Sequence, residues 1–334
     1  MTRTSVGIGT AMALALVLSG AARAQAPLPP LVEQHIAAAR AAAGAEHAGL
    51  FDAVCGTTRT VISQAASPQP AGAGRGGGTP PVAPPRETWH AEPVKVFDNL
   101  YFVGQTEYSA WAITTSQGII LLDAIYDYSV EDEVVGGLKK LGLDPAQIKY
   151  VVVSHGHGDH AAGAKLLQDR FGSRLVMSAA DYDLMDQQNP PWKPKRDIVA
   201  TDGYKLTLGD TTLTLTLTPG HTPGTISTLV PVRDGGRTHL AAAWGGTAFN
   251  FGPDKDRLRM YIDSSVKFRD IVQKAGADVL IANHTVFDGS KTKIPALAAR
   301  KPGAPHPYVI GPDAVRRYLT VANECAQAAL AALS

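Results

Sequence analysis

The sequence predicts an α/β fold in which β-sheets are covered by helices. Three observations lead to this prediction. Short apolar or alternating segments typical of strands fill much of the chain from residue 89 onward. Segments with helical periodicity lie among them and close the chain, a mixture typical of sheets covered by helices. Potential metal ligands follow three of the strands, where α/β proteins place their sites.

The first 24 residues have the composition of an export signal. Arg3 gives a positive start, residues 6–18 are apolar, and Ala22-Arg23-Ala24 is a small-x-small cleavage sequence. The apolar segment is shorter than the about 20 residues that a membrane span needs. We therefore expect cleavage after Ala24 and a periplasmic or secreted protein. Cleavage after Ala26 and an uncleaved membrane anchor are the alternatives.

The expected mature chain is almost neutral. The full chain of 334 residues has 31 lysines and arginines and 30 acidic residues, and residues 1–24 hold two arginines and no acid, which leaves 29 basic and 30 acidic residues. No cluster of basic residues stands out. Nucleic acids and anionic membranes need a positive footprint, so we expect neither as a partner. A small-molecule substrate is expected, with no stable membrane insertion after signal cleavage.

We expect three parts in the mature chain. Residues 25–63 are predicted to form a helical extension, since apolar residues of 31–43 recur at helical spacing before Gly44. Residues 64–88 are dense in proline, glycine and alanine and predict a flexible linker. Residues 89–334 are long enough to form a main domain with its own core.

Within the main domain, strands and helices are expected in a definite order. Strands are predicted at 94–97, 100–105, 110–115, 118–124, 148–154, 175–178, 204–208, 212–218, 226–232, 238–244 and 279–283. Helices are predicted at 130–141, 161–171, 179–188, 263–275 and 313–333.

Five of the ten histidines and one aspartate form a single pattern. The segment HGHGDH at 155–160 follows a buried strand, and two later histidines follow strands in TPGHTPG and IANHT. The candidate ligands are His155, His157, Asp159, His160, His221 and His284. A catalytic zinc takes three protein ligands and keeps one position for water, so six ligands suit two zinc ions. The other histidines, His35, His47, His90, His239 and His306, are expected to be surface or hydrogen-bonded residues.

Two cysteines, Cys55 and Cys325, leave two interpretations open. In an oxidising compartment they are candidates for a disulfide between the extension and the last helix. Two unpaired buried thiols are the alternative.

The motifs resemble those of the metallo-β-lactamase superfamily. HGHGDH matches the H-x-H-x-D-H motif, and Asp123 in IILLDA resembles the aspartate that supports the site. YFVGQ, GIILLDA, SHGHGDHAAGA, LVMSAAD, LTPGHTPGTIS and ADVLIANH are most similar, in order and spacing, to the third subclass of class B β-lactamases. The resemblance covers about residues 95–290 and implies an αββα sandwich, preceded here by the helical extension.

The resemblance also implies a site and an activity. His155, His157 and His221 would hold one zinc ion, and Asp159, His160 and His284 a second, giving two Zn²⁺ per chain. Asp159 would orient the nucleophile and Asp123 would hold a ligand histidine in the required tautomer. The implied enzyme is a zinc-dependent hydrolase in which a metal-bound hydroxide attacks a carbonyl, with the amide of a β-lactam as the first candidate.

Other functions are kept as alternatives. One is a hydrolase of another cyclic or activated ester or amide, such as a lactone. Another is an iron-dependent redox enzyme or a protein that only binds metal. Hydrolases of the glyoxalase II and lactonase type carry a bridging aspartate where this chain has Gly245 or Gly246, and Thr247 offers the only hydroxyl nearby. Residues 108–111 are expected as an apolar wall; Trp192 either joins that wall or packs its own loop.

Overall fold

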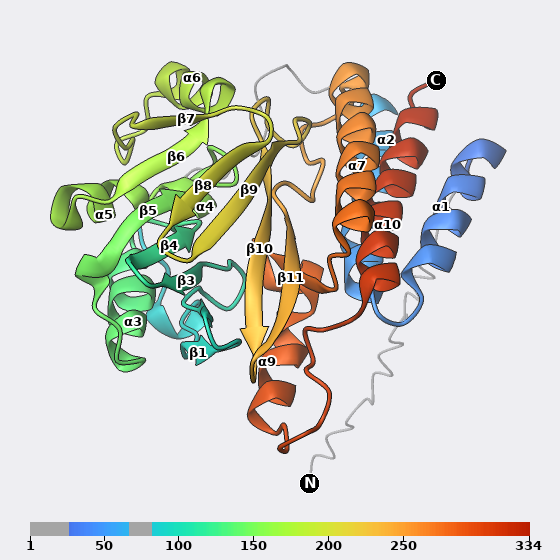
Figure 1. Cartoon of the computed structure of the whole chain (residues 1–334). Coiled ribbons are helices and arrows are strands. Elements are labelled where there is room, and N and C mark those ends of the chain that lie inside the picture. The colour runs from blue at the N-terminus through green and yellow to red at the C-terminus, as the bar shows by residue number, and fades with distance from the viewer. Residues whose placement is uncertain (1–26, 67–81) are drawn as a thin grey trace, which may run out of the picture.

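The computed structural model describes residues 27–66 and 82–334. The expected signal peptide (1–24) and most of the expected linker (64–88) lie outside the described residues. Two β-sheets form the centre of the molecule, with helices on both outer sides (Figure 1). This is the αββα sandwich that the sequence predicted.

The first sheet has seven strands in sequential order. They are β1 (Val94–Lys95), β2 (Leu100–Phe102), β3 (Trp111–Thr115), β4 (Gly118–Leu122), β5 (Ile148–Val152), β6 (Arg174–Ser178) and β7 (Ile198–Ala200). β1 to β4 pair antiparallel, and β4 to β7 pair parallel. Parallel pairing requires crossover segments, and the helices between these strands supply them.

The second sheet has five strands in the order β12-β11-β10-β9-β8. They are β8 (Tyr204–Leu208), β9 (Thr211–Leu217), β10 (Ile226–Asp234), β11 (Arg237–Trp244) and β12 (Val279–Ala282). β12 joins β11 in parallel, while the other pairs are antiparallel. The inner faces of the two sheets meet in one apolar core, which includes Leu100, Ile113, Ile120, Leu213, Val230 and Ile281.

Helices cover the outer face of each sheet (Figure 1). The first sheet is covered by α3 (Gly137–Lys140), α5 (Ala164–Phe171) and α6 (Ala179–Gln188). The short helix α4 (Gly158–Ala161) opens the connection from β5 to β6. The second sheet is covered by α7 (Lys255–Ala275) and α10 (Pro312–Ala331). The short helices α8 (Thr285–Asp288) and α9 (Ser290–Ala298) lie between these two in the sequence. No helix in the described ranges is both long and apolar enough to span a membrane.

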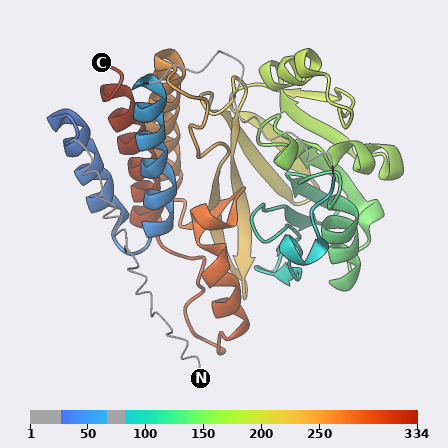
Figure 2. The same ribbon diagram turned by 180° about the vertical axis from the view of Figure 1, so that it is seen from behind.

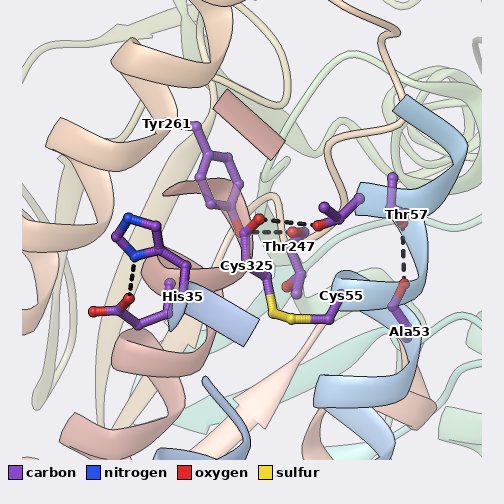
Figure 3. The surroundings of a disulfide bond; sticks show 9 residues. His35, Ala53, Cys55, Thr57, Thr247, Tyr261 and Cys325 are labelled. Carbon is purple, nitrogen blue, oxygen red and sulfur yellow. Dashed lines mark hydrogen bonds and ion pairs between the residues drawn. A yellow bond between two sulfur atoms is a disulfide. The ribbon is translucent and has the colours of Figure 1, made fainter. Parts of the chain in front are cut away.

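The N-terminal helices α1 (Pro30–Ala43) and α2 (Ala48–Ala66) pack beside α10 (Figures 1 and 2). Val54 of α2 is fully buried in the same apolar cluster as Val315 and Leu319 of α10. Cys55 and Cys325 form a disulfide within this cluster (Figure 3). The extension therefore shares its core with the last helix of the main domain.

Several helices differ from the prediction in instructive ways. The expected helix 130–141 starts as a π-helix over Glu131–Gly136. The expected helix 161–171 is interrupted because the Gly163 amide donates to Ile125 O instead of continuing the helix. α7 begins eight residues before the expected start at 263, where the Asp254 side chain caps the amides of Asp256 and Arg257. α8 and α9 were not predicted.

Candidate metal centre

Three segments that follow strands bring the predicted ligands together. Residues 155–160 follow β5, His221 follows β9, and His284 follows β12. The two sheets are joined here by a hydrogen bond from the Ile226 amide to Ser154 O. The segments border a cavity of about 220 Å³. All six predicted ligands therefore lie at one edge of the sandwich.

The first three ligands, which we call the His155 trio, are His155, His157 and His221. Nε2 of His221 lies 3.1 Å from Nε2 of His155 and 3.1 Å from Nδ1 of His157. Their ligand atoms all lie within 4.8 Å of one another. His157 therefore points its Nδ1 into the trio, whereas His155 and His221 point their Nε2 atoms into it.

The other three ligands, which we call the Asp159 trio, are Asp159, His160 and His284. Nε2 of His160 lies 3.2 Å from Asp159 Oδ2 and 3.2 Å from Nε2 of His284. His284 Nε2 is 3.6 Å from Asp159 Oδ2. The second group of donors is therefore as compact as the first.

Carbonyl and carboxylate oxygens hold the outer nitrogens of three of these histidines. His155 Nδ1 donates to Gly245 O at 2.8 Å, and His221 Nδ1 donates to Ala248 O. His160 Nδ1 forms an ion pair with Asp123 Oδ2 at 3.0 Å. A proton held on Nδ1 leaves the Nε2 lone pair free for a metal. The contacts therefore favour the tautomer that metal binding needs.

The residues present fit a pair of zinc ions. Zinc–nitrogen distances of 2.0–2.1 Å set tetrahedral ligands about 3.3 Å apart, close to the 3.1 Å between the ring nitrogens of the His155 trio. Where two neutral imidazoles face each other nitrogen to nitrogen, at most one hydrogen bond can form between them, so the lone pairs of three converging ring nitrogens cannot all be satisfied by protons. Asp159 Oδ1 is buried with no hydrogen-bond partner among the described residues. Each of these features is accounted for by a bound cation.

Burial keeps four of the histidines neutral. It lowers the pKa of His157 to about 4 and that of His284 to about 3, and it holds the pKa values of His155 and His221 well below the usual range. Neutral imidazole is the metal-binding form. Without a metal, burial also lowers the pKa of His160, but the carboxylates of Asp159 and Asp123 outweigh it and raise that pKa to about 10.

Asp123 holds an unusual backbone conformation at the end of β4. Its φ is 58° and that of Ile125 is 52°, a region where a β-branched residue such as isoleucine is a true outlier. Asp123 Oδ1 accepts from the Ser154 amide at 2.6 Å, and Oδ2 accepts from Ser154 Oγ at 2.9 Å. These bonds aim the carboxylate at His160, the position that the resemblance implied.

The metal motif is partly helical rather than a loop. His157 is the residue before α4, and Asp159 and His160 lie in its first turn. His157 and His160 thus face different trios because the chain changes from extended to helical conformation between them. Sequence alone placed the helix start at residue 161, after the motif.

A buried aspartate that sequence analysis missed clamps two ligand segments together. Asp181 in α6 accepts from the amides of Gly156 and Gly224 at 2.8 and 2.7 Å and from Thr222 Oγ1 at 2.7 Å. Arg257 in α7 donates to the carbonyls of Gly220 and His221. Asp181 ends the quoted segment LVMSAAD, which was the one signal available for it; Arg257 lies in no quoted segment.

Close packing explains the glycines at the expected place of a bridging aspartate. A Cβ on Gly245 would lie 1.8 Å from Ile226 O, and a Cβ on Gly246 would lie 2.5 Å from the Cβ of His221. Thr247 Oγ1 is 3.1 Å from the Tyr318 hydroxyl, so the Thr247 hydroxyl is already engaged. No carboxylate fits between the trios from this segment.

The cavity walls differ in part from the expected ones. Tyr108 lines the cavity, but Trp111 is buried between the sheets and donates to Ala282 O. Trp192 packs in the core beneath the first sheet, which decides between its two interpretations. Sequence analysis missed five lining residues, Tyr126, Ala248, Asn250, Asn283 and Phe287.

The histidines outside the pattern have structural partners. His35 pairs with Glu324, His90 with Glu133, and His239 with Asp278. His47 donates to Ala314 O and His306 donates to Val96 O. None of them contributes to either trio.

Fold and site together define a protein of the αββα class with two candidate metal-ligand trios at one sheet edge. Residues 103–235 match the sequence model of a family described as the metallo-beta-lactamase superfamily. This part of the chain is similar to that superfamily, and solved structures with the metallo-β-lactamase fold cover 68–76% of the chain. The predicted resemblance to the superfamily is confirmed.

Solved structures of subclass B3 metallo-β-lactamases are similar to the chain. BJP-1 of Bradyrhizobium japonicum is 27% identical, with a TM-score of 0.59 over 68% of this chain and 89% of that one. GOB-18 of Elizabethkingia meningoseptica, at 21% identity, has a TM-score of 0.60 over 76% of this chain and 97% of that one, and supports the fold alone. The predicted similarity to the third subclass is thereby confirmed.

Curated relatives match a shorter region. A hydroxyacylglutathione hydrolase of Acidiphilium cryptum is 30% identical over 131 residues, 39% of this chain and 46% of that protein. An N-acyl homoserine lactonase of a Bacillus species is 31% identical over 125 residues, 36% of this chain and 48% of that protein. The chain thus spans about half the length of these relatives.

Proposed function

We propose that this protein is a dinuclear zinc hydrolase that opens the amide of a β-lactam. The observation that carries the proposal is the pair of ligand trios beside one cavity, which five of their six residues line, with Gly245 and Gly246 where no bridging carboxylate fits. The similarity to subclass B3 enzymes supports the same substrate class.

The His155 trio would hold one zinc ion and the Asp159 trio the other. When bound, zinc lowers the pKa of water to about 7 and polarises a carbonyl. The protein supplies the rest. Gly245 O and Asp123 fix the tautomers of His155 and His160. Asp159 Oδ1, unpaired among the described residues, would accept a hydrogen bond from the attacking water and orient it.

The aromatic wall would bind the apolar part of the substrate. Tyr108 and Phe287 pack against the ring of His284, each with a centroid separation of 5.1 Å. Tyr126 packs edge-on against Tyr108 at 5.2 Å. Because these rings support one another, they would exclude water from one side of the scissile bond.

A lactone is the second candidate substrate, and one observation favours it. The described residues that line the cavity include no lysine or arginine. β-Lactam antibiotics carry a carboxylate, which gains from a cationic partner, whereas an acyl-homoserine lactone is uncharged. The similarity to N-acyl homoserine lactonases points the same way.

An activity screen on the zinc-loaded protein tests the proposal. We expect hydrolysis of nitrocefin and a carbapenem, with loss of activity in Asp159→Ala and after chelation, and recovery when zinc is restored. Hydrolysis of an acyl-homoserine lactone without β-lactam turnover would replace the first candidate by the second. Metal analysis should give about two zinc ions per chain; iron instead would contradict the zinc enzyme.

We also propose that the protein acts outside the cytoplasm, in the periplasm or as a secreted enzyme. The Cys55–Cys325 disulfide supports this location, because structural disulfides are rare in reducing compartments. The residues expected to form the export signal agree with it. N-terminal sequencing of the protein recovered from the periplasm or medium should begin at Gln25; a full-length N-terminus there would contradict cleavage.

A further inference from the structure

We propose that Asn283 is a positioning residue that anchors the polar contacts running between the two ligand trios. The inference rests on the proposed metal centre and adds to it. Asn283 precedes His284 at the end of β12, and its side chain is 6% exposed. It borders the cavity, but its amide donates to Gly245 O and Ser154 Oγ, so its effect on chemistry would act through the ligands that these two groups hold.

Both hydrogens of the Asn283 amide have acceptors. Nδ2 donates to Gly245 O at 2.9 Å and to Ser154 Oγ at 3.2 Å. Gly245 O also accepts from His155 Nδ1 at 2.8 Å. One carbonyl therefore orients a ligand of the His155 trio while the Asn283 amide holds that carbonyl in place.

The second set of these contacts leads to the other trio. Ser154 Oγ accepts from Asn283 and donates to Asp123 Oδ2 at 2.9 Å. The same Asp123 oxygen lies 3.0 Å from His160 Nδ1. The contacts thus run from His155 to the ion pair between Asp123 and His160. Because Ser154 Oγ also lies 3.1 Å from His155 Nδ1, the Asn283 amide holds both oxygens that contact this ring nitrogen.

The backbone around Asn283 is fixed independently of its side chain. The Ser109 amide donates to Asn283 O at 2.9 Å, and Tyr108 and His284 form an isolated β-bridge. A substitution of the side chain therefore leaves His284 attached to the neighbouring segment. What it removes is the restraint on Gly245 O and Ser154 Oγ, and with it the orientation of His155 and His160.

Two substitutions separate hydrogen bonding from packing. Asn283→Leu keeps the approximate volume and removes both donated bonds. Asn283→Asp keeps the shape but turns a carboxylate toward two oxygen acceptors and toward Asp123. We expect both variants to weaken binding of the first and the second zinc ion by about 10–100-fold, the usual effect of losing a group that supports a ligand.

Asn323 provides a matched control. It is also buried, at 5% exposure, and its Nδ2 donates to Ile262 O and to Ser265 Oγ, far from the ligands in sequence. Asn323→Leu removes the same number and kind of bonds. It should lower the unfolding temperature to a similar degree while both zinc affinities stay at the wild-type value.

Chelator competition and cobalt titration measure the two binding steps separately, without substrate. Lowered affinity and altered cobalt absorption bands in both steps, for the Asn283 variants but not for Asn323→Leu, would support the proposal. Wild-type affinities in Asn283→Leu, or an effect confined to one step, would overturn it while the metal centre stands. A wild-type protein that binds no metal would overturn both the centre and this inference.

Discussion

Cys55 in α2 is bonded to Cys325 in α10, although 270 positions separate them in the sequence. Around this bond, Thr58 Oγ1 donates to Cys325 O, and His47 Nε2 donates to Ala314 O (the disulfide is drawn in Figure 3). α2 also contacts α8, the short helix that follows His284 and carries Phe287. The extension is therefore connected to the wall of the cavity.

Loss of the disulfide should destabilise the protein without emptying the metal centre. A bond that closes so long a loop restricts the unfolded chain, and such bonds contribute about 2–5 kcal/mol. We expect Cys55→Ala/Cys325→Ala to lower the free energy of unfolding by that amount, as measured in denaturant titrations. Zinc content should stay unchanged, because Asp181 and Arg257 hold the ligand segments from elsewhere. Loss of zinc at full stability would contradict this view.

Replacing Gly49 by a larger residue should disturb substrate binding, because Gly49 packs against α8, which carries the cavity residue Phe287. A Cβ at Gly49 in α2 would lie 3.2 Å from Val286 O in α8, tighter than most such contacts. We expect Gly49→Val to displace α8 and Phe287, raising KM several-fold with a smaller change in kcat. Gly56→Ala in the same helix is the control: nothing lies within 4 Å of its Cβ, so it should stabilise the helix by about 0.5–1 kcal/mol. Equal kinetics for both variants would refute the connection.

Side chains at Gly245 should not be tolerated. A Cβ there would overlap Ile226 O at 1.8 Å, and forced overpacking costs about 1–3 kcal/mol or more. We expect Gly245→Ala, and more so Gly245→Asp, to lower the unfolding temperature and to weaken zinc binding, since Gly245 O orients His155. A stable Gly245→Asp variant that binds two zinc ions would show that this chain can accept a bridging carboxylate after all.

The metal-free protein should be most stable near pH 6.5. The pKa values of His157 and His284 fall to about 4 and about 3 in the folded state, so the unfolded chain takes up their protons first as pH falls below 6.5. His160 has a raised pKa of about 10. Its contribution is complete below 6.5 and is lost as pH rises toward 10. Each proton gives a slope of up to about 1.4 kcal/mol per pH unit.

Thermal unfolding of the protein after metal removal by a chelator, across pH 4–10, measures the loss of stability on the acid side (the acid limb) and on the alkaline side (the alkaline limb). In Asp123→Asn the alkaline limb should flatten, because one of the two carboxylates that raise the pKa of His160 is gone. The acid limb should remain. A flat profile in the wild type, or an unchanged alkaline limb in Asp123→Asn, would show that these histidines do not govern the pH dependence.

Local sequence patterns were enough to predict the kind of fold and the six candidate ligands that the structure brings together. Strand-forming runs are local in the chain, and the ligand segments follow them directly, so the pattern alone places His155, His221 and His284 at strand ends. The dense motif at 155–160 has little use in packing, which made its ligands recognisable.

The groups that support those candidate ligands became visible only once distant segments were seen packed together. Arg257 lies in a segment without a motif, whereas Asp181 and Asn283 stand in the quoted segments LVMSAAD and ADVLIANH, where nothing marked their roles. Each of the three contacts residues at least 25 positions away. The pairing of Cys55 with Cys325 and the burial of Trp192 likewise depend on how distant segments pack. Local periodicity carries no information about such contacts, because they arise only when the sheets and helices have closed around one another.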